Sequence, residues 1–344
     1  MTSTLLRAAA PALAAAGIAL AATPSLADAV ADFYGGKTVT IVVAAGPGGG
    51  HSVYSQLIAP AVQKHLPGNP KLIIQNMGGA GGTKAANYLA TAAAQDGSYI
   101  GILLSDTPLS ARIRATGIKY DPSKFQYLGG ADITRSAFVV LKSAGVNTIE
   151  DAKKKEVLVG STGKSSQTFV VPTIVNAVLG TKFKPVLGYR GMGDIYLAVD
   201  RKEVQGFANV WSAVTYLREN WVKDDLVTVI ATISPDPLPD LPKVPKITDM
   251  VKDPLDRKLI ELIAGNGVLG RGWLAPPGAP KDRVGALRTA FAAAFRDPEA
   301  NAAAGARKLP WETASWQDMQ AQVDTIMKTD RAVIDRMKSI LGAK

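Results

Sequence analysis

The 344-residue sequence contains no cysteine, only two histidines and few aromatic residues. Without cysteine there are no thiol nucleophiles, zinc–thiolate sites, iron–sulfur clusters or disulfides. Neither His51 nor His65 has further metal-ligating side chains close by in sequence, and Asp106 stands alone. A Gly-x-Ser-x-Gly nucleophile elbow is also absent, which argues against a serine hydrolase. We therefore expect no catalytic residues, no cofactor and no metal.

Clustered positive charge is scarce although the chain is basic, with a formal net charge of +10. Lysines and arginines are scattered, and Lys153-Lys154-Lys155 is their only run of three. Glu150 and Asp151 precede this run in the first turn of a predicted helix, so a solvated helix face explains it. Because basic and aromatic residues do not alternate, we expect no nucleic-acid partner. The basic balance suits an anionic ligand.

After the N-terminus, no apolar stretch is long enough to cross a bilayer. Residues 1–27 read as a secretory signal peptide, with Arg7 in the positive region and an alanine-rich apolar segment at 8–22. Ser25-Leu26-Ala27 fits the small-x-small cleavage rule, and Ala27-Asp28-Ala29 is a second candidate. We therefore expect an exported protein whose mature chain begins at Asp28 or Val30. An exported protein without cysteine is typical of the bacterial periplasm, where we expect this one.

The first regular unit of the chain is a strand, a glycine loop and a helix. A β-branched run at 39–43 predicts a buried strand, and apolar residues at helical spacing predict a helix ending at Leu66. Between them lies Gly46-Pro47-Gly48-Gly49-Gly50-His51-Ser52, with Ser52 placed to cap the helix. Exposed amides at such a helix N-terminus bind anions, but a tight connection needing positive φ angles explains the glycines equally well. The loop lacks the P-loop and dinucleotide signatures, which argues against nucleotides.

Strands and helices alternate along the rest of the chain, which predicts an α/β fold with mainly parallel sheets. In such sheets, loops after the carboxyl ends of the strands share one ligand-binding rim. Ser105 and Asp106 follow one predicted strand, and Asn209 and Trp211 follow another. The predicted strands lie at 71–75, 98–104, 138–141, 157–159, 184–187, 204–208 and 226–232, and late helices at 281–295 and 315–341.

Together, the motifs resemble the substrate-binding receptors of tripartite tricarboxylate transporters, the Bug family of periplasmic proteins, over nearly the whole mature chain. Their order and spacing carry the resemblance more than any single motif. The similar segments are Gly46-Pro47-Gly48-Gly49-Gly50, Asn76-Met77-Gly78-Gly79-Ala80-Gly81-Gly82, Asp96-Gly97-Ser98-Tyr99, Tyr120-Asp121-Pro122, Gly160-Ser161-Thr162-Gly163-Lys164-Ser165-Ser166, Tyr189-Arg190-Gly191 and the proline-rich stretches at 238–245 and 275–280.

The resemblance implies a two-domain α/β fold of the type II periplasmic-binding-protein class, the Venus flytrap, with a hinge between the domains. Domain 1 would be discontinuous, at 28–132 and 233–344, and domain 2 would occupy 133–232. We place the hinge where the chain would cross between domains, near 128–137 and 228–234.

The resemblance also implies a small carboxylate held by backbone amides and hydroxyls from one loop of each domain. Departures from the family pattern are His51-Ser52 in place of Thr-Asp, Met77 in place of arginine, and Arg201-Lys202 in place of a glycine pair. The expected binding residues are Gly48, Gly49, Gly50, His51, Ser52, Ser105, Asp106, Ser161, Thr162, Gly163, Ser165, Ser166, Asn209 and Trp211.

We therefore expect a monomeric solute-binding protein that delivers a mono- or dicarboxylate to the membrane subunits of a tripartite tricarboxylate-type transporter. Aromatic carboxylates are included because Trp211 offers a stacking surface. Three alternatives share the exported location: a carboxylate-binding sensor, a receptor for an ABC-type importer and a periplasmic hydrolase.

Overall fold

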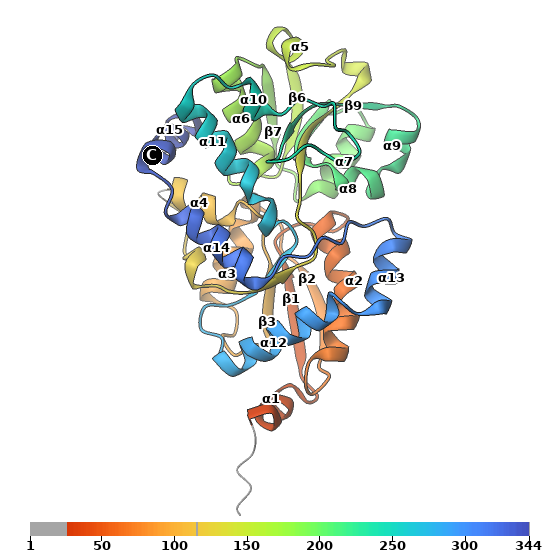
Figure 1. Cartoon of the computed structure of the whole chain (residues 1–344), viewed down its shortest axis with the longest axis vertical. Helices are drawn as coiled ribbons and strands as arrows, with labels where there is room; N and C mark the ends of the chain where they lie inside the picture. The colour runs from red at the N-terminus through yellow and green to blue at the C-terminus, as the bar shows by residue number, and fades with distance from the viewer. Residues whose placement is uncertain (1–25, 115, 344) are drawn as a thin grey trace, which may run out of the picture.

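The computed structural model describes residues 26–114 and 116–343, which form two lobes, one above the other in Figure 1. Each lobe is built on its own five-stranded sheet. We call the part around the sheet β2-β1-β3-β10-β4 the first lobe and the part around β7-β6-β8-β5-β9 the second lobe. Most of the predicted signal peptide, residues 1–25, lies outside the described residues, and both expected cleavage sites fall in the first turns of α1 (Leu26–Tyr34).

The first sheet consists of β1 (Thr38–Val43), β2 (Lys71–Asn76), β3 (Tyr99–Ile102), β4 (Gln126–Gly130) and β10 (Gly272–Ala275). Only β10 runs antiparallel to its neighbours, so the sheet is mainly parallel as predicted. Side chains of β1 alternate between two apolar cores: Ile41 and Val43 face one, and Val42 faces the other. Burial on both faces explains the unbroken β-branched run of this strand.

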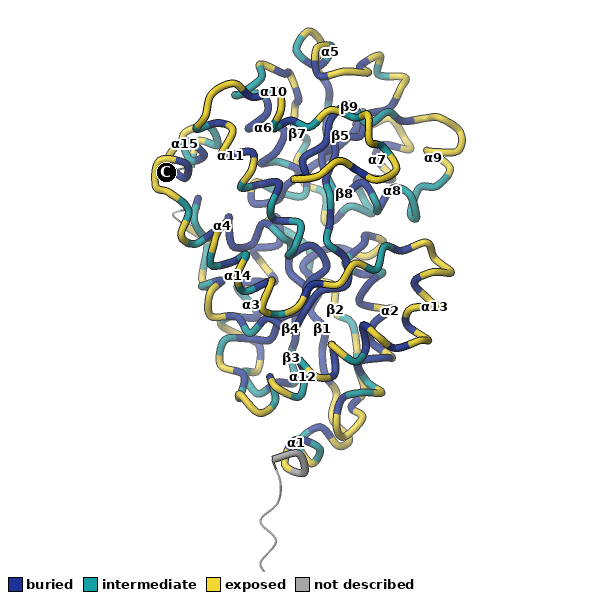
Figure 2. Tube along the Cα trace, viewed as in Figure 1, coloured by how far each residue is buried: buried dark blue, intermediate teal, exposed yellow. Residues whose placement is uncertain are grey.

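The second sheet consists of β5 (Ser136–Leu141), β6 (Val157–Ser161), β7 (Phe183–Leu187), β8 (Gly206–Val210) and β9 (Val227–Ile233). Here β5 is antiparallel to both β8 and β9, whereas β6 pairs with β7 and β8 in parallel. The rings of Phe138 and Phe183 stack with centroids 4.4 Å apart over one face. The inner strands of both sheets are buried, as Figure 2 shows, whereas the edge strands β2 and β7 are mostly half-buried or exposed.

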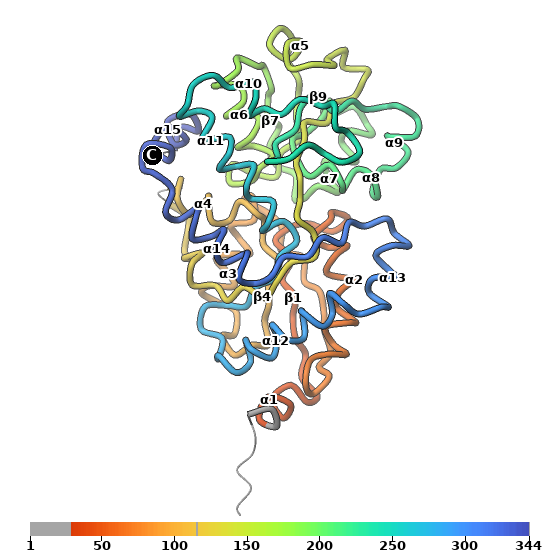
Figure 3. Tube along the Cα trace, viewed as in Figure 1, coloured from red at the N-terminus to blue at the C-terminus, as the bar shows by residue number. Residues whose placement is uncertain are grey.

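Helices cover both faces of each sheet (Figures 1 and 3). On the first lobe, α2, α12 and α13 pack together on one face, and α3, α4 and α14 lie on the other. On the second lobe, α6, α11 and α15 pack as one layer, and α7 and α8 belong to the opposite core. The bounds are α2 (Gly50–His65), α3 (Thr83–Thr91), α4 (Thr107–Ile113), α5 (Ile149–Lys154), α6 (Gln167–Leu179), α7 (Met192–Asp200), α8 (Ser212–Leu217), α9 (Glu219–Lys223), α10 (Ile247–Met250), α11 (Pro254–Ala264), α12 (Lys281–Ala294), α13 (Pro298–Ala306), α14 (Trp316–Met327) and α15 (Arg331–Leu341), with short 3₁₀ turns η1 (Ala80–Gly82), η2 (Pro122–Lys124), η3 (Lys142–Ala144) and η4 (Gly265–Leu269).

The last predicted helix, at 315–341, is in fact two helices, so this prediction was wrong. The chain turns between α14 and α15, and Arg112 donates to the carbonyls of Met327 and Thr329 at this turn. These hydrogen bonds satisfy carbonyls that a continuous helix would have paired internally. The apolar stripe therefore serves both lobes within one continuous apolar cluster: Val323 packs in the first lobe with α4 and β4, and Met337 packs against α6 and α11.

Among the described residues, three chain segments cross between the lobes, at 131–135, 265–271 and 328–330. The first two run side by side, because Ala131 donates to the carbonyl of Arg271 and Thr134 donates to that of Gly267. The crossing expected at 228–234 was wrong, since Ile233 still pairs with Ser136 and the chain then continues into α10 and α11 on the second lobe. The domain limits at 132 and 232 stay a prediction; the packing of α10, α11 and α15 favours a larger second domain.

None of the helices within 26–114 and 116–343 combines the length and hydropathy needed to cross a bilayer.

Candidate ligand-binding site

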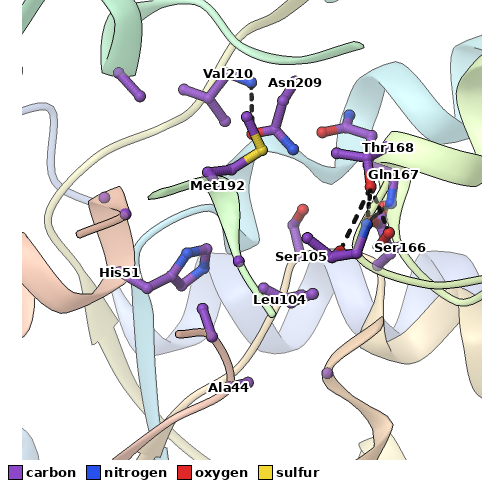
Figure 4. Close-up of a pocket in the computed structure, with 18 of the residues that line it drawn as sticks. Ala44, His51, Leu104, Ser105, Ser166, Gln167, Thr168, Met192, Asn209 and Val210 are labelled. Carbon is purple, nitrogen blue, oxygen red and sulfur yellow. Dashed lines mark hydrogen bonds between the residues drawn. The ribbon is translucent and has the colours of Figure 1, made fainter. Parts of the chain in front are cut away.

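A cavity lies between the lobes, and residues from both lobes and from two crossing segments line it (Figure 4). The predicted rim residues Gly49, Gly50, His51, Ser105, Asp106, Thr162, Ser166 and Asn209 all line this cavity. Further lining residues, which were not among the expected binding residues, are Ala44, Ala45, Gly79, Gly82, Leu104, Thr134, Gln167, Thr168, Arg190, Gly191, Met192, Tyr196, Val210, Ala213, Gly270 and Arg271.

The N-terminus of α2 forms one end of the cavity. Gly49 is its N-cap, and the amides of Ser52 and Val53 donate to the carbonyl of Gly49. Within the described residues, the amides of Gly48 to His51 donate no hydrogen bond. The helix dipole and these unpartnered donors favour an anion at this point. Glycine at position 50 leaves room for the guanidinium of Arg271, because an added Cβ would collide with its Nη2 and displace it.

His51 presents a neutral imidazole to the cavity. Its Nδ1 lies 3.2 Å from Nη1 of Arg271, and a guanidinium can only donate, so Nδ1 accepts and Nε2 carries the proton. Burial, followed by the charge of Arg271, holds the pKa of His51 well below its usual value. Nε2 is buried and makes no hydrogen bond of good geometry among the described residues, although the backbones of Leu103 and Gly270 approach the imidazole and partly offset the lowering of its pKa. The side chain therefore offers one N–H donor without a positive charge.

Arg271 is the buried cation of the site, and the sequence analysis did not identify it. Its side chain is 3% exposed, and its Nε lies 3.9 Å from Oδ2 of Asp132 without a hydrogen bond. Its guanidinium also lies over the ring of Tyr54, with 5.6 Å between the guanidinium carbon and the ring centroid. Burial raises the pKa of Asp132 to about 6, although Arg271 acts in the opposite direction. The sequence signal was an arginine within the glycine-rich stretch 265–272.

Asp106 connects the first lobe to the N-terminus of a second-lobe helix. Its Oδ2 accepts from the backbone amide of Gln167 at 2.6 Å, and its Oδ1 lies 3.5 Å from Nδ2 of Asn266. Gln167 is the first residue of α6, so the carboxylate occupies the N-terminus of that helix. Burial raises the pKa of Asp106 to about 6, partly offset by these two hydrogen bonds.

The hydroxyl groups of the second-lobe loop at 161–168 mostly form hydrogen bonds with one another or with the backbone of the same loop. The amide of Thr162 donates to Oγ1 of Thr168 at 3.1 Å, and Oγ of Ser166 lies 2.6 Å from the same Oγ1. Ser161, Gly163 and Ser165, which we expected to bind ligand, do not line the cavity. Ser165 instead accepts a hydrogen bond from Arg114, and the carbonyl of Gly163 accepts from Ser166.

Three other expected contacts also lie outside the cavity: Gly48, Ser52 and Trp211. Ser52 is not the helix cap that we expected; its hydroxyl donates to the carbonyl of Gly46 and accepts from Asn76 at 2.6 Å. Trp211 is buried, and its Nε1 donates to Oδ2 of Asp240 at 2.6 Å. The expected stacking surface therefore does not line the cavity. Ser105 and Asn209 do face the cavity (Figure 4).

The two lobes touch around the cavity. The amide of Gly46 donates to the carbonyl of Arg190 at 3.0 Å, and Oγ of Ser110 donates to the carbonyl of Ser165 at 2.9 Å. A Cβ on Gly193 would lie 2.6 Å from the carbonyl of Pro47, so close approach of the lobes requires glycine there. The structure therefore shows the lobes closed over the site.

Between its polar ends the cavity has an apolar wall made by Leu104, Met192, Tyr196, Val210 and Ala213. Arg190 also lines the cavity, but its side chain is largely exposed and pairs with Asp194. In the part of the chain that the structure describes, no group of three or more histidine, aspartate or glutamate side chains is placed to hold a metal ion. The site thus combines amide donors, one imidazole donor, one buried guanidinium and apolar surface.

Solved structures of periplasmic binding proteins have the same fold. BugD superimposes with a TM-score of 0.69 at 19% identity, covering 88% of this chain and 97% of BugD. MatC from Rhodopseudomonas palustris, solved with malate, gives 0.66 at 19% identity, covering 89% and 99%. A second R. palustris protein, solved with adipate, gives 0.67 at 21% identity, covering 89% and 97%. These likenesses confirm the predicted two-domain periplasmic-binding-protein fold.

A search of curated protein sequences found no match. The model of the tripartite tricarboxylate transporter family receptor matches residues 53–338, which begin just after the glycine loop. The match covers most of the chain and confirms the resemblance drawn from the motifs. The chain therefore belongs to the tripartite tricarboxylate transporter receptor family.

Proposed function

We propose that this protein binds one small organic carboxylate between its two lobes and delivers it to the membrane subunits of a tripartite tricarboxylate transporter. One observation carries the proposal: the unpartnered amides at the N-terminus of α2 meet the Nε2–H of His51 and the buried guanidinium of Arg271 at one end of a closed cavity. Together these groups provide donors and positive charge for a carboxylate in a desolvated site.

The apolar wall of the cavity suits a hydrocarbon body attached to that carboxylate. MatC and the second R. palustris protein were solved with malate and adipate, which supports an organic acid as ligand here. Binding rather than hydrolysis is proposed because Nδ1 of His51 faces Arg271 and not a hydroxyl. Recovery of the ligand chemically unchanged after long incubation with the protein would support this reading, and turnover would contradict it.

Family membership supports a periplasmic location. Residues 1–27 would act as the signal peptide that directs export to it. We propose cleavage at Ala27 or Ala29, a monomeric mature protein and transporter subunits as its partners. An intact mass that still includes residues 1–27 in the native soluble protein would contradict cleavage. Loss of carboxylate uptake from cells lacking this protein would connect it to a transporter, whereas loss of a transcriptional response alone would favour a sensor.

Thermal shift with a panel of carboxylates, sugars, amino acids and polyamines tests the ligand class. A ligand at about 100 times its dissociation constant stabilises the fold by roughly 2.7 kcal/mol, which raises Tm by several degrees. Carboxylates should raise Tm, and Arg271→Gln should reduce that rise. A rise with a neutral sugar or polyamine, and none with any carboxylate, would overturn the proposal.

A further inference from the structure

We propose that Asp106 makes this receptor selective for monocarboxylates, because its buried carboxylate already occupies the second helix N-terminus that faces the cavity. The inference rests on the proposed function and adds which class of carboxylate the site accepts. It concerns the end of the cavity opposite the amides of α2, where a longer ligand would place its second polar group.

Two helices direct their N-termini at the cavity, α2 from the first lobe and α6 from the second. The amides of Gly48 to His51 at the start of α2 donate no hydrogen bond among the described residues, so this end is open to a ligand anion. At the start of α6 the first helical amide, that of Gln167, donates to Asp106, whereas the corresponding amide of Gly50 donates no hydrogen bond. The following amides behave alike in both helices, since Phe169 and Val170 donate to the carbonyl of Ser166 as Ser52 and Val53 donate to that of Gly49. One of the two anion positions is therefore filled by the protein itself.

The charge of Asp106 is not balanced by a cation. Its hydrogen-bond partners are neutral, the amide of Gln167 and the side chain of Asn266, and no ion pair involving Asp106 occurs among the described residues. Its side chain is buried, so solvent does not screen it, and Asp106 lines the cavity. A second carboxylate at this end would face a like charge in a poorly screened environment.

The surface between the two ends supports the same conclusion. Leu104 and Met192 lie along the cavity between His51 and the start of α6 (Figure 4). A ligand whose carboxylate binds the amides of α2 would place an apolar body against these side chains. Its far end can be apolar, or it can donate a hydrogen bond to Asp106. The malate and adipate of the two R. palustris structures carry a second carboxylate instead, so selectivity would differ within this fold.

The test compares dicarboxylates with their monomethyl esters, which have nearly the same size but one charge fewer. Dissociation constants for succinate, adipate, suberate and the three esters are measured by calorimetry at pH 8 for the wild type and Asp106→Asn. For every pair in which binding is detected, we expect the wild type to bind the monomethyl ester at least tenfold more tightly than the diacid. Asp106→Asn should reduce the ratio of the diacid's dissociation constant to the ester's at least tenfold, chiefly because the diacid binds this variant more tightly.

The matched control is Asp225→Asn, which removes one negative charge from an exposed side chain on the second lobe and should leave every ratio unchanged. Diacids binding the wild type as tightly as their esters would overturn the inference while leaving the proposed function standing. An unchanged ratio in folded Asp106→Asn would overturn it as well. Should that variant not fold, Asp106→Ser replaces it. If neither variant folds, the wild-type ratio of ester to diacid affinity decides alone. Absence of binding by all six compounds to every variant would instead contradict the proposed function.

Discussion

Nη1 of Arg271 lies 3.2 Å from Nδ1 of His51, although the two residues are 220 positions apart in the chain. His51 lies in the first turn of α2, whereas Arg271 is the last residue of the segment 265–271 that crosses between the lobes. The pair therefore joins the anion-binding end of the cavity to the hinge region. It also fixes the imidazole tautomer, so that a donor and not an acceptor is available to the ligand.

Replacing Arg271 by glutamine should weaken carboxylate binding at least tenfold and also destabilise the protein. Asp132 would then remain buried without its cation, a change that costs about 3–5 kcal/mol in comparable buried pairs. Calorimetry gives the affinity and denaturant unfolding gives the stability. Arg135→Gln is the matched control, since Arg135 pairs with the half-exposed Glu312 outside the cavity and should leave affinity unchanged.

The same variant should change the protonation of His51. In the wild type, burial and Arg271 hold the pKa of His51 well below its usual value, which favours the neutral imidazole. Removing Arg271 removes one of the two causes, and the pKa should rise toward the ordinary range. Nitrogen NMR of His51 measures both tautomer and titration. An imidazole that is already titrating between pH 6 and 8 in the wild type would contradict the tautomer assignment.

Gly50→Ala should reduce ligand affinity at least tenfold while leaving the fold intact. The new Cβ would lie 2.4 Å from Nη2 of Arg271 and 2.8 Å from the hydroxyl of Tyr216, so the guanidinium must move. Gly285→Ala in α12 is the control, because its Cβ would meet open space and should stabilise the helix by about 0.5–1 kcal/mol. Equal ligand affinity in Gly50→Ala and the wild type would show that Arg271 does not contribute to binding.

Asp106 should make the unfolding free energy depend on pH in a defined direction. Its pKa in the folded protein is raised to about 6, above the 3.8 of an unperturbed aspartate, so the folded state binds more protons between these values. The contribution of Asp106 to stability is therefore greatest in acid and declines as pH rises from about 4 to about 6, by roughly 3 kcal/mol. Subtracting the unfolding free energy of Asp106→Asn from that of the wild type at each pH isolates this contribution. A difference that increases as the pH rises from about 4 to about 6 would contradict the prediction.

Trp211→Phe should leave carboxylate affinity within a factor of two of the wild type, because Trp211 does not line the cavity. The substitution removes the Nε1 donor to Asp240 and should lower stability by about 1 kcal/mol. Met192→Ala, by contrast, truncates a side chain of the apolar wall and should weaken binding. Calorimetry on both variants compares their carboxylate affinities directly. A large loss of affinity in Trp211→Phe but not in Met192→Ala would support the stacking role that we first expected for Trp211.

The sequence predicted the fold largely through patterns that local physics controls. The buried strand at 39–43 and the glycine loop after it were recognisable because burial on both faces selects β-branched residues. The strands β4 and β10 were missed: Gly129, Gly130 and Gly272 give them no such pattern, and their place in the sheet depends on neighbours distant in sequence.

The site was predicted less completely, for a different reason. Loop residues such as His51 and Asp106 follow strands and could be expected at the rim from topology alone. Arg271 reaches the cavity from a crossing segment, and no local rule indicates which segment crosses between lobes. Trp211 follows a strand too, but the direction of its side chain depends on Asp240, in a separate loop. Positions along the chain were therefore easier to infer than side-chain directions.

The position of β10 between β3 and β4 has a consequence for the order of folding. During synthesis the first sheet cannot be completed until residue 275 has emerged, because its antiparallel strand follows the entire second sheet. The second sheet, by contrast, draws its strands from one uninterrupted stretch, 136–233. We therefore expect the later-synthesised lobe to form its sheet first and the N-terminal strands to wait for their last partner, reversing the usual N-to-C order of domain folding.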